Sequence, residues 1–214
     1  MEFFVNFTVS TTVIYMMYPP IAALLSTTPK FKNYRRPNYV VKNIIKSITL
    51  PLLLAYVAIS MEISLKDAST FDNALVRRVA SAYVANDLVG LLQCELPITT
   101  RIHHIVSCLF LIYAHTIDFN NDRDAKALFF YTLFSAVAFP VNLYLGLRHC
   151  FASLPVLHNI SKYIYLCSLL MNWGTQVVLG LGSPFYMFLL MFIVYDDVVL
   201  LRWLWGAKQL TSKK

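Results

Sequence analysis

Charged residues are scarce in this chain of 214 residues. Asp, Glu, Lys and Arg make up only 14% of it, whereas 58% of the residues are hydrophobic and the mean hydropathy is +0.60. This balance excludes a soluble domain of this size and predicts that a lipid bilayer surrounds the chain. The net charge is +7, but no basic stripe is interleaved with aromatic residues, so no nucleic-acid partner is expected.

Cysteine is also rare, and its residues are not arranged in pairs. Cys94, Cys108, Cys150 and Cys167 lie at or inside apolar runs, and no C-x-x-C spacing occurs. A disulfide scaffold is therefore excluded. We expect the four side chains to be reduced and buried as small hydrophobic groups.

Long apolar runs are what the sequence has in abundance. Because roughly 20 apolar residues cross a bilayer, they predict an all-α, polytopic membrane bundle of about seven transmembrane helices. The predicted spans are 3–28, 40–61, 75–93, 101–118, 126–147, 159–181 and 184–205. They use the whole chain, 1–214, which predicts a single transmembrane domain, and Pro51 and Pro140 inside spans predict kinks.

The basic residues predict the orientation. Residues 30–46 include six Lys and Arg and no acid, so this segment is expected in the cytoplasm. The N-terminus is then outside or lumenal and the C-terminus cytoplasmic, and thirteen of the 18 Lys and Arg residues fall on the cytoplasmic side against five outside. Docking of acidic headgroups or phosphates is the alternative interpretation of segment 30–46.

Ionisable side chains inside a span are costly, so each one is a candidate for function. Asp87 and the adjacent His103 and His104 lie near the predicted cytoplasmic ends of the third and fourth spans, at depths that agree within several Å at ~1.5 Å per residue. An imidazole beside a carboxylate in a low-dielectric pocket is a general base, and such a site suits transfer of an acyl group to an amine or hydroxyl.

Other polar residues are expected in the same half of the bundle. Asn142, Arg101 and the Asp196-Asp197 pair are candidate substrate-binding residues, whereas His115 lies ~16 Å deeper and is more easily explained by packing. The histidines could instead lie among the headgroups, and Asp196-Asp197 could hold helices together by hydrogen bonds.

The sequence lacks the residues that two other kinds of site require, a metal centre and a retinal-binding lysine. No H-x-x-H or H-x-x-x-H spacing places two imidazoles on one helical face, so no metal centre is expected. The last span has no lysine before Lys208, which excludes a retinal-type Schiff base there.

Three stretches together carry a family resemblance: Tyr83-Val-Ala-Asn-Asp87-Leu, Arg101-Ile-His103-His104-Ile-Val-Ser107 and Pro140-Val-Asn142-Leu-Tyr-Leu. In order and spacing they resemble the TLC-domain family, which includes ceramide synthases and the ceroid-lipofuscinosis endoplasmic-reticulum protein. The resemblance covers about residues 40–205. The His-Asp-x-x-Asp run of ceramide synthases is missing, so the chain resembles a small, divergent member.

The resemblance implies a lipid-metabolism protein of the endoplasmic reticulum or another endomembrane. It implies acyl-CoA as co-substrate, a lipid acceptor, catalysis by His103 and His104, and Asp87 as supporting acid. The bilayer and a lipid substrate are the expected partners, no bound cofactor is expected, and a homodimer is left open. The alternatives are a non-catalytic lipid-binding or cargo protein and a proton pathway along His104, His115, Asp118 and Asp87.

Overall fold

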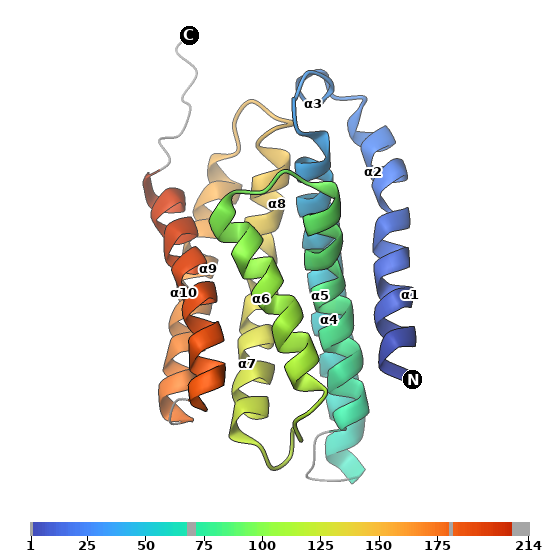
Figure 1. Ribbon diagram of the computed structural model, residues 1–214. Helices are drawn as coiled ribbons and strands as arrows, with labels where there is room; N and C mark the ends of the chain where they lie inside the picture. The colour runs from blue at the N-terminus through green and yellow to red at the C-terminus, as the bar shows by residue number, and fades with distance from the viewer. Residues whose placement is uncertain (1, 68–71, 180–181, 207–214) are drawn as a thin grey trace.

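The computed structural model describes residues 2–67, 72–179 and 182–206, with side chains placed for 4–60, 72–179 and 182–206. Its regular secondary structure in these ranges is entirely α-helical (Figure 1). The helices are α1 (Glu2–Met16), α2 (Tyr18–Leu25), α3 (Pro29–Lys32), α4 (Pro37–Asp67), α5 (Asn73–Gln93), α6 (Ile98–Ala114), α7 (Arg123–Val137), α8 (Phe139–Leu147), α9 (Pro155–Val178) and α10 (Pro184–Gly206).

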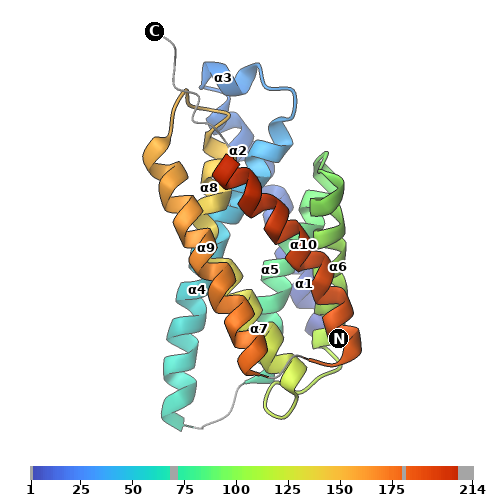
Figure 2. The same ribbon diagram turned by 90° about the vertical axis from the view of Figure 1, so that its left-hand side faces the viewer.

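The helices form long rods that alternate in direction along the chain, as Figures 1 and 2 show. α1 and α2 make one rod, and α7 and α8 make another that bends by 41°. α4, α5, α6, α10, α9 and the α7–α8 rod pack in a closed ring in which each contacts its two neighbours. The α1–α2 rod lies outside this ring against α5 and α4, so the interior of the ring is the place for a site.

The chain is a helical membrane protein. Among the described residues, three helical segments are long and apolar enough to span a bilayer, namely Phe4–Leu25, Pro37–Ser60 and Pro184–Gly206, and the α7–α8 rod would be a fourth. This is fewer than the seven predicted. α6 is apolar but shorter, and α5 and α9 include polar residues such as Asp87 and Asn172, which are buried in the bundle.

Large apolar side chains cover the outer surface of the rods. On α10, Phe188 and Met191 are each more than half exposed, and on α9 the same holds for Leu170 and Met171. Such apolar surface is expected against lipid rather than water. All four cysteines are free thiols, but the prediction that all four are buried holds only for Cys150, because Cys94 and Cys108 are partly exposed and Cys167 of α9 is exposed.

The break between α7 and α8 follows from Pro140, which has no N–H to donate and lies in the first turn of α8. Hydroxyls of α9 satisfy carbonyls beside the break. Ser168 donates to the carbonyl of Phe134, and Ser161 donates to that of Pro140 at 2.8 Å. These bonds hold α9 against the bend. Asn142 follows two residues later and lines the interior.

Side chains also close the helix ends opposite α3. Asp72 caps α5 by accepting from the backbone N–H groups of Ala74 and Leu75. Arg77 of α5 donates to the carbonyls of Ala114 and Ile117 at the C-terminal end of α6. The rods that carry the site are therefore fixed relative to one another at this end.

Candidate functional site

A polar cavity of about 300 Å³ lies inside the ring. It extends from the bundle end that carries α3 (Figure 2), where Tyr39 and Arg148 line it, to the middle of the bundle, where Tyr83 of α5 and Ser135 of α7 line it. Five of the predicted site residues line it: His103, His104, Asn142, Asp196 and Asp197.

His104 is held between a carboxylate and an amine. Its Nδ1 lies 3.0 Å from Oδ1 of the fully buried Asp87, and its Nε2 lies 2.8 Å from Nζ of Lys42. Because an ionised carboxylate only accepts, the ring proton belongs on Nδ1, and Nε2 accepts from Lys42. Lys46 donates to the same Asp87 oxygen at 2.5 Å. Four side chains from three helices thus form one polar chain, in the order Lys42, His104, Asp87, Lys46.

His103 belongs to a second pair. Its Nδ1 lies 3.3 Å from Oδ2 of Asp196, whose other oxygen accepts from Thr100 at 3.3 Å. The rings of His103 and His104 stand edge to face, with centroids 5.6 Å apart. Because successive residues of a helix point ~100° apart, each imidazole has its own carboxylate and the two are not redundant.

Asp197 lies at the cavity wall and accepts from two tyrosines. Tyr131 of α7 and Tyr165 of α9 both donate to its carboxylate, the latter at 2.9 Å. The side-chain carbonyl oxygen of Asn172, by contrast, is buried without a hydrogen-bond partner among the described residues, although Asn172 lines the cavity. An unpaired buried carbonyl costs about 1–3 kcal/mol, which a ligand with an N–H or O–H donor would recover.

Two predicted residues lie elsewhere. Arg101 is exposed and does not line the cavity, whereas Arg148 does, with its guanidinium 4.3 Å from the ring centroid of Trp203. His115 ends α6 at the opposite end of the bundle, away from His104. At 1.5 Å of rise per residue, the eleven residues from His104 to His115 span ~16 Å along the helix, so His115 is out of reach of the site.

Sequence reasoning missed Lys42 and Lys46 as site residues. It counted both among the basic residues of segment 30–46 that set the orientation, although the predicted span 40–61 also included them; in the structure α4 begins at Pro37, and the two side chains are buried in its second and third turns. The signal was present, since lysines at i and i+4 share a helical face and a proline often marks the first turn of a helix.

Asp87, His103 and His104 offer three ligand atoms within 4.8 Å of one another, a spacing that suits a metal ion. The amines do not fit such an ion. Lys46 already contacts the Asp87 oxygen and the Lys42 amine contacts His104 Nε2, so two of the ligand atoms have partners and the charge of Lys46 would repel a cation. The donor set suits proton transfer better than metal binding.

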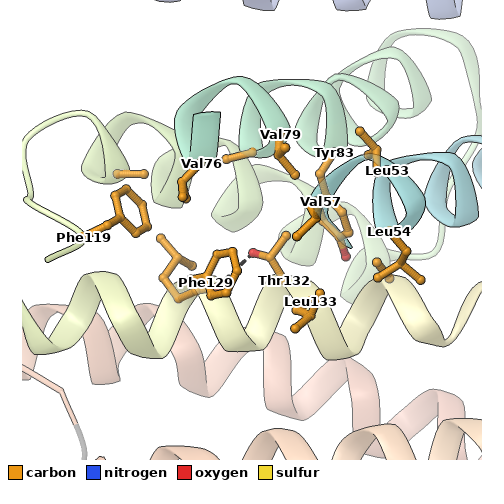
Figure 3. A pocket seen from close by; sticks show the side chains of 14 residues that line it. Leu53, Leu54, Val57, Val76, Val79, Tyr83, Phe119, Phe129, Thr132 and Leu133 are labelled. Carbon is orange, nitrogen blue, oxygen red and sulfur yellow. Dashed lines mark hydrogen bonds between the residues drawn. The ribbon is translucent and has the colours of Figure 1, made fainter. Parts of the chain in front are cut away.

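Two apolar cavities of about 40 Å³ each lie beside the polar one. The first shares His103 and Tyr83 with the polar cavity, and the second shares Tyr83 and Thr132 with the first. The second, shown in Figure 3, extends to Phe119 near the far end of the bundle. The three therefore form a row whose polar end holds the imidazoles and whose far end is lined by hydrocarbon.

No protein-family model, curated protein or solved structure matches this chain. The function of the chain is therefore inferred from the residues of the site.

Proposed function

We propose that this chain is an acyl-CoA-dependent lipid acyltransferase of an endomembrane, such as the endoplasmic reticulum, with His104 as general base. The single observation that carries the proposal is His104 between Asp87 and an amine, at a polar cavity that has apolar cavities beside it. Asp87 stabilises the imidazolium that forms when Nε2 removes a proton from the acceptor. His103, paired with Asp196, is the second candidate for proton transfer.

The cavity row supports an acyl donor and a lipid acceptor. An acyl chain is apolar, as are most of the side chains that line the two cavities between His103 and Phe119. An acceptor amine or hydroxyl at the polar end would meet the unpaired oxygen of Asn172. Arg148 lines the same end and Lys32 and Arg35 are exposed near it, so basic groups are in place for CoA phosphates.

We also propose that all seven rods span the membrane, with the N-terminus outside or lumenal. The polar residues that lower the hydropathy of α5 and α9 are buried in the bundle, which supports this count. The basic residues support a cytoplasmic position for the α3 end. The polar cavity would then open on the side where acyl-CoA is found.

The test uses the purified chain in phosphatidylcholine nanodiscs with palmitoyl-CoA and a sphingoid base, and mass spectrometry of the lipid product. His104→Ala should lower the rate about 100-fold or more, the usual contribution of a general base. His115→Ala, on the same helix but outside the cavity, should not change it. Equal product from the parent and His104→Ala, with both variants folded by size exclusion, would refute the proposal.

A non-catalytic lipid-binding protein is the second candidate. The observation in its favour is that Lys42 occupies His104 Nε2, the nitrogen that a base would use. This candidate expects a lipid that copurifies in the cavity row and no turnover of palmitoyl-CoA by the pure chain.

A further inference from the structure

Lys42 lies buried at the wall of the polar cavity, beside an imidazole. Its side chain is 5% exposed, it lines the polar cavity, and its amine contacts the imidazole of His104 at 2.8 Å. Lys46, one turn further along α4, contacts the Asp87 carboxylate instead. Two lysines on one helical face therefore have different partners: Lys46 contacts a carboxylate, and Lys42 contacts an imidazole.

The fold makes room for the Lys42 side chain. Gly90 of α5 lies beside its stem, and a Cβ at Gly90 would stand 2.9 Å from Lys42 Cε and 3.2 Å from Cδ. Contacts this short would displace the flexible side chain. The absence of a side chain at Gly90 thus lets Lys42 pass α5 and reach His104.

We propose that Lys42 is a self-acylation site, on which an acyl-CoA thioester transfers its acyl group to the chain itself. The inference rests on the proposed function, because it uses the same donor and the same base. The neutral amine of Lys42 attacks the thioester carbonyl, so that an N–C bond forms and the C–S bond breaks. The amine proton passes to His104 Nε2 and then to the departing thiolate, giving an Nε-acyl-lysine and the free thiol of CoA.

The order of groups matches that of a nucleophile, histidine and aspartate triad. Lys42 takes the place of the nucleophile, His104 removes its proton, and Asp87 fixes the ring and stabilises the imidazolium. Because the product is an amide, it resists hydrolysis, and the acyl chain stays attached inside the ring. The apolar cavities beyond His103 are next to this position and would hold the chain.

The experiment incubates the purified full chain in phosphatidylcholine nanodiscs with palmitoyl-CoA, digests it and locates palmitoyl groups by tandem mass spectrometry. Lys42 should be acylated about 100-fold faster than the exposed Lys32 in the same sample, the contribution of a general base. The group should resist hydroxylamine, unlike a thioester on Cys94. His104→Ala should remove the advantage over Lys32, and Gly90→Ala should reduce it by moving the amine from Nε2.

Two results would overturn the inference: equal rates at Lys42 and Lys32 in the parent, or an unchanged rate at Lys42 in His104→Ala. The comparison with Lys32 in the parent needs no variant, so a folding defect cannot hide the outcome. Acylated lipid product without acyl-Lys42 would overturn this inference and leave the proposed function standing. Acyl-Lys42 without lipid product would overturn the proposed function and leave the inference about Lys42 standing.

Discussion

The Lys46–Asp87 pair offers the sharpest test of the polar chain. Nζ and Oδ1 lie 2.5 Å apart, and the two side chains are only 8% and 0% exposed. We predict that Lys46→Met destabilises the fold. It removes the ammonium from the buried Asp87 carboxylate and, of the four linked side chains, leaves only His104 in contact with it. Asp87→Leu should do the same by leaving a buried ammonium. The double variant removes both charges together.

The magnitude follows from the burial. Breaking a buried ion pair by removing one partner costs about 3–5 kcal/mol, and replacing both with apolar groups costs far less. For a chain of this size, each single variant should lower the Tm by roughly 6–20 °C, since 1 kcal/mol corresponds to about 2–4 °C. Because the double-variant cost is smaller than either single cost, the sum of the two single costs should exceed it by at least about 3 kcal/mol, the upper end of the coupling found for residues in contact.

The assay is a double-mutant cycle by thermal unfolding in one detergent, followed by tryptophan fluorescence. Arg36 and Glu95 provide the matched control, because they form a 3.1 Å ion pair with exposures of 56% and 79%. Arg36→Met with Glu95→Leu should show coupling of only about 0–1 kcal/mol. Additive costs at Lys46 and Asp87, or coupling no larger than that of the control pair, would show that the buried pair does not hold the site together.

Two further predictions concern packing and pH. Gly146→Ala would place a Cβ 2.7 Å from Ile44 Cδ1 at the α4–α8 contact, so it should lower the free energy of unfolding by about 1–3 kcal/mol, measured by thermal unfolding. In the control variant Gly174→Ala, the added Cβ meets nothing within 4 Å, so this variant should be at least as stable as the parent. Equal stability of the two variants would contradict this close contact. Burial, with Arg148 beside it, lowers the pKa of His149 from 6.5 to about 4, so the unfolded state binds the extra proton between these values and stability falls as the pH falls through them. His149→Phe should therefore lose less Tm than the parent between pH 7 and pH 4.5, and identical losses would refute this role.

The sequence predicted the helical rods well because their signals are local. The predicted span 75–93 matches α5 from Asn73 to Gln93, and 184–205 matches α10 from Pro184 to Gly206. The span 126–147 contains the α7–α8 break that its proline predicted. α4 continues through Pro51 without ending. Whether a proline breaks a helix depends on neighbours that satisfy the freed carbonyls, and the sequence does not show those neighbours.

The sequence predicted how deep the site residues lie in the bundle, but not the direction in which their side chains point. The rise per residue placed Asp87 and His104 at one depth, and the structure brings them to 3.0 Å. Rotation about the helix axis decides the rest, and it directs Arg101 outward while Arg148 lines the cavity. Rotation is set by packing between rods that are distant in sequence, so neither composition nor spacing specifies it.

The two lysines of α4 also alter the argument for orientation. Counting residues 30–46 as one loop gave thirteen basic residues on the cytoplasmic side against five, but Lys42 and Lys46 are buried beside His104 and Asp87. Without them the numbers are eleven and five, so the bias that the positive-inside rule uses persists. A buried ammonium says nothing about which side of the membrane it came from, but its desolvation is costly, and only a close partner offsets that cost. Lys42 and Lys46 are therefore weak evidence for topology, but they mark the buried polar cluster to which we assign the proposed proton transfer.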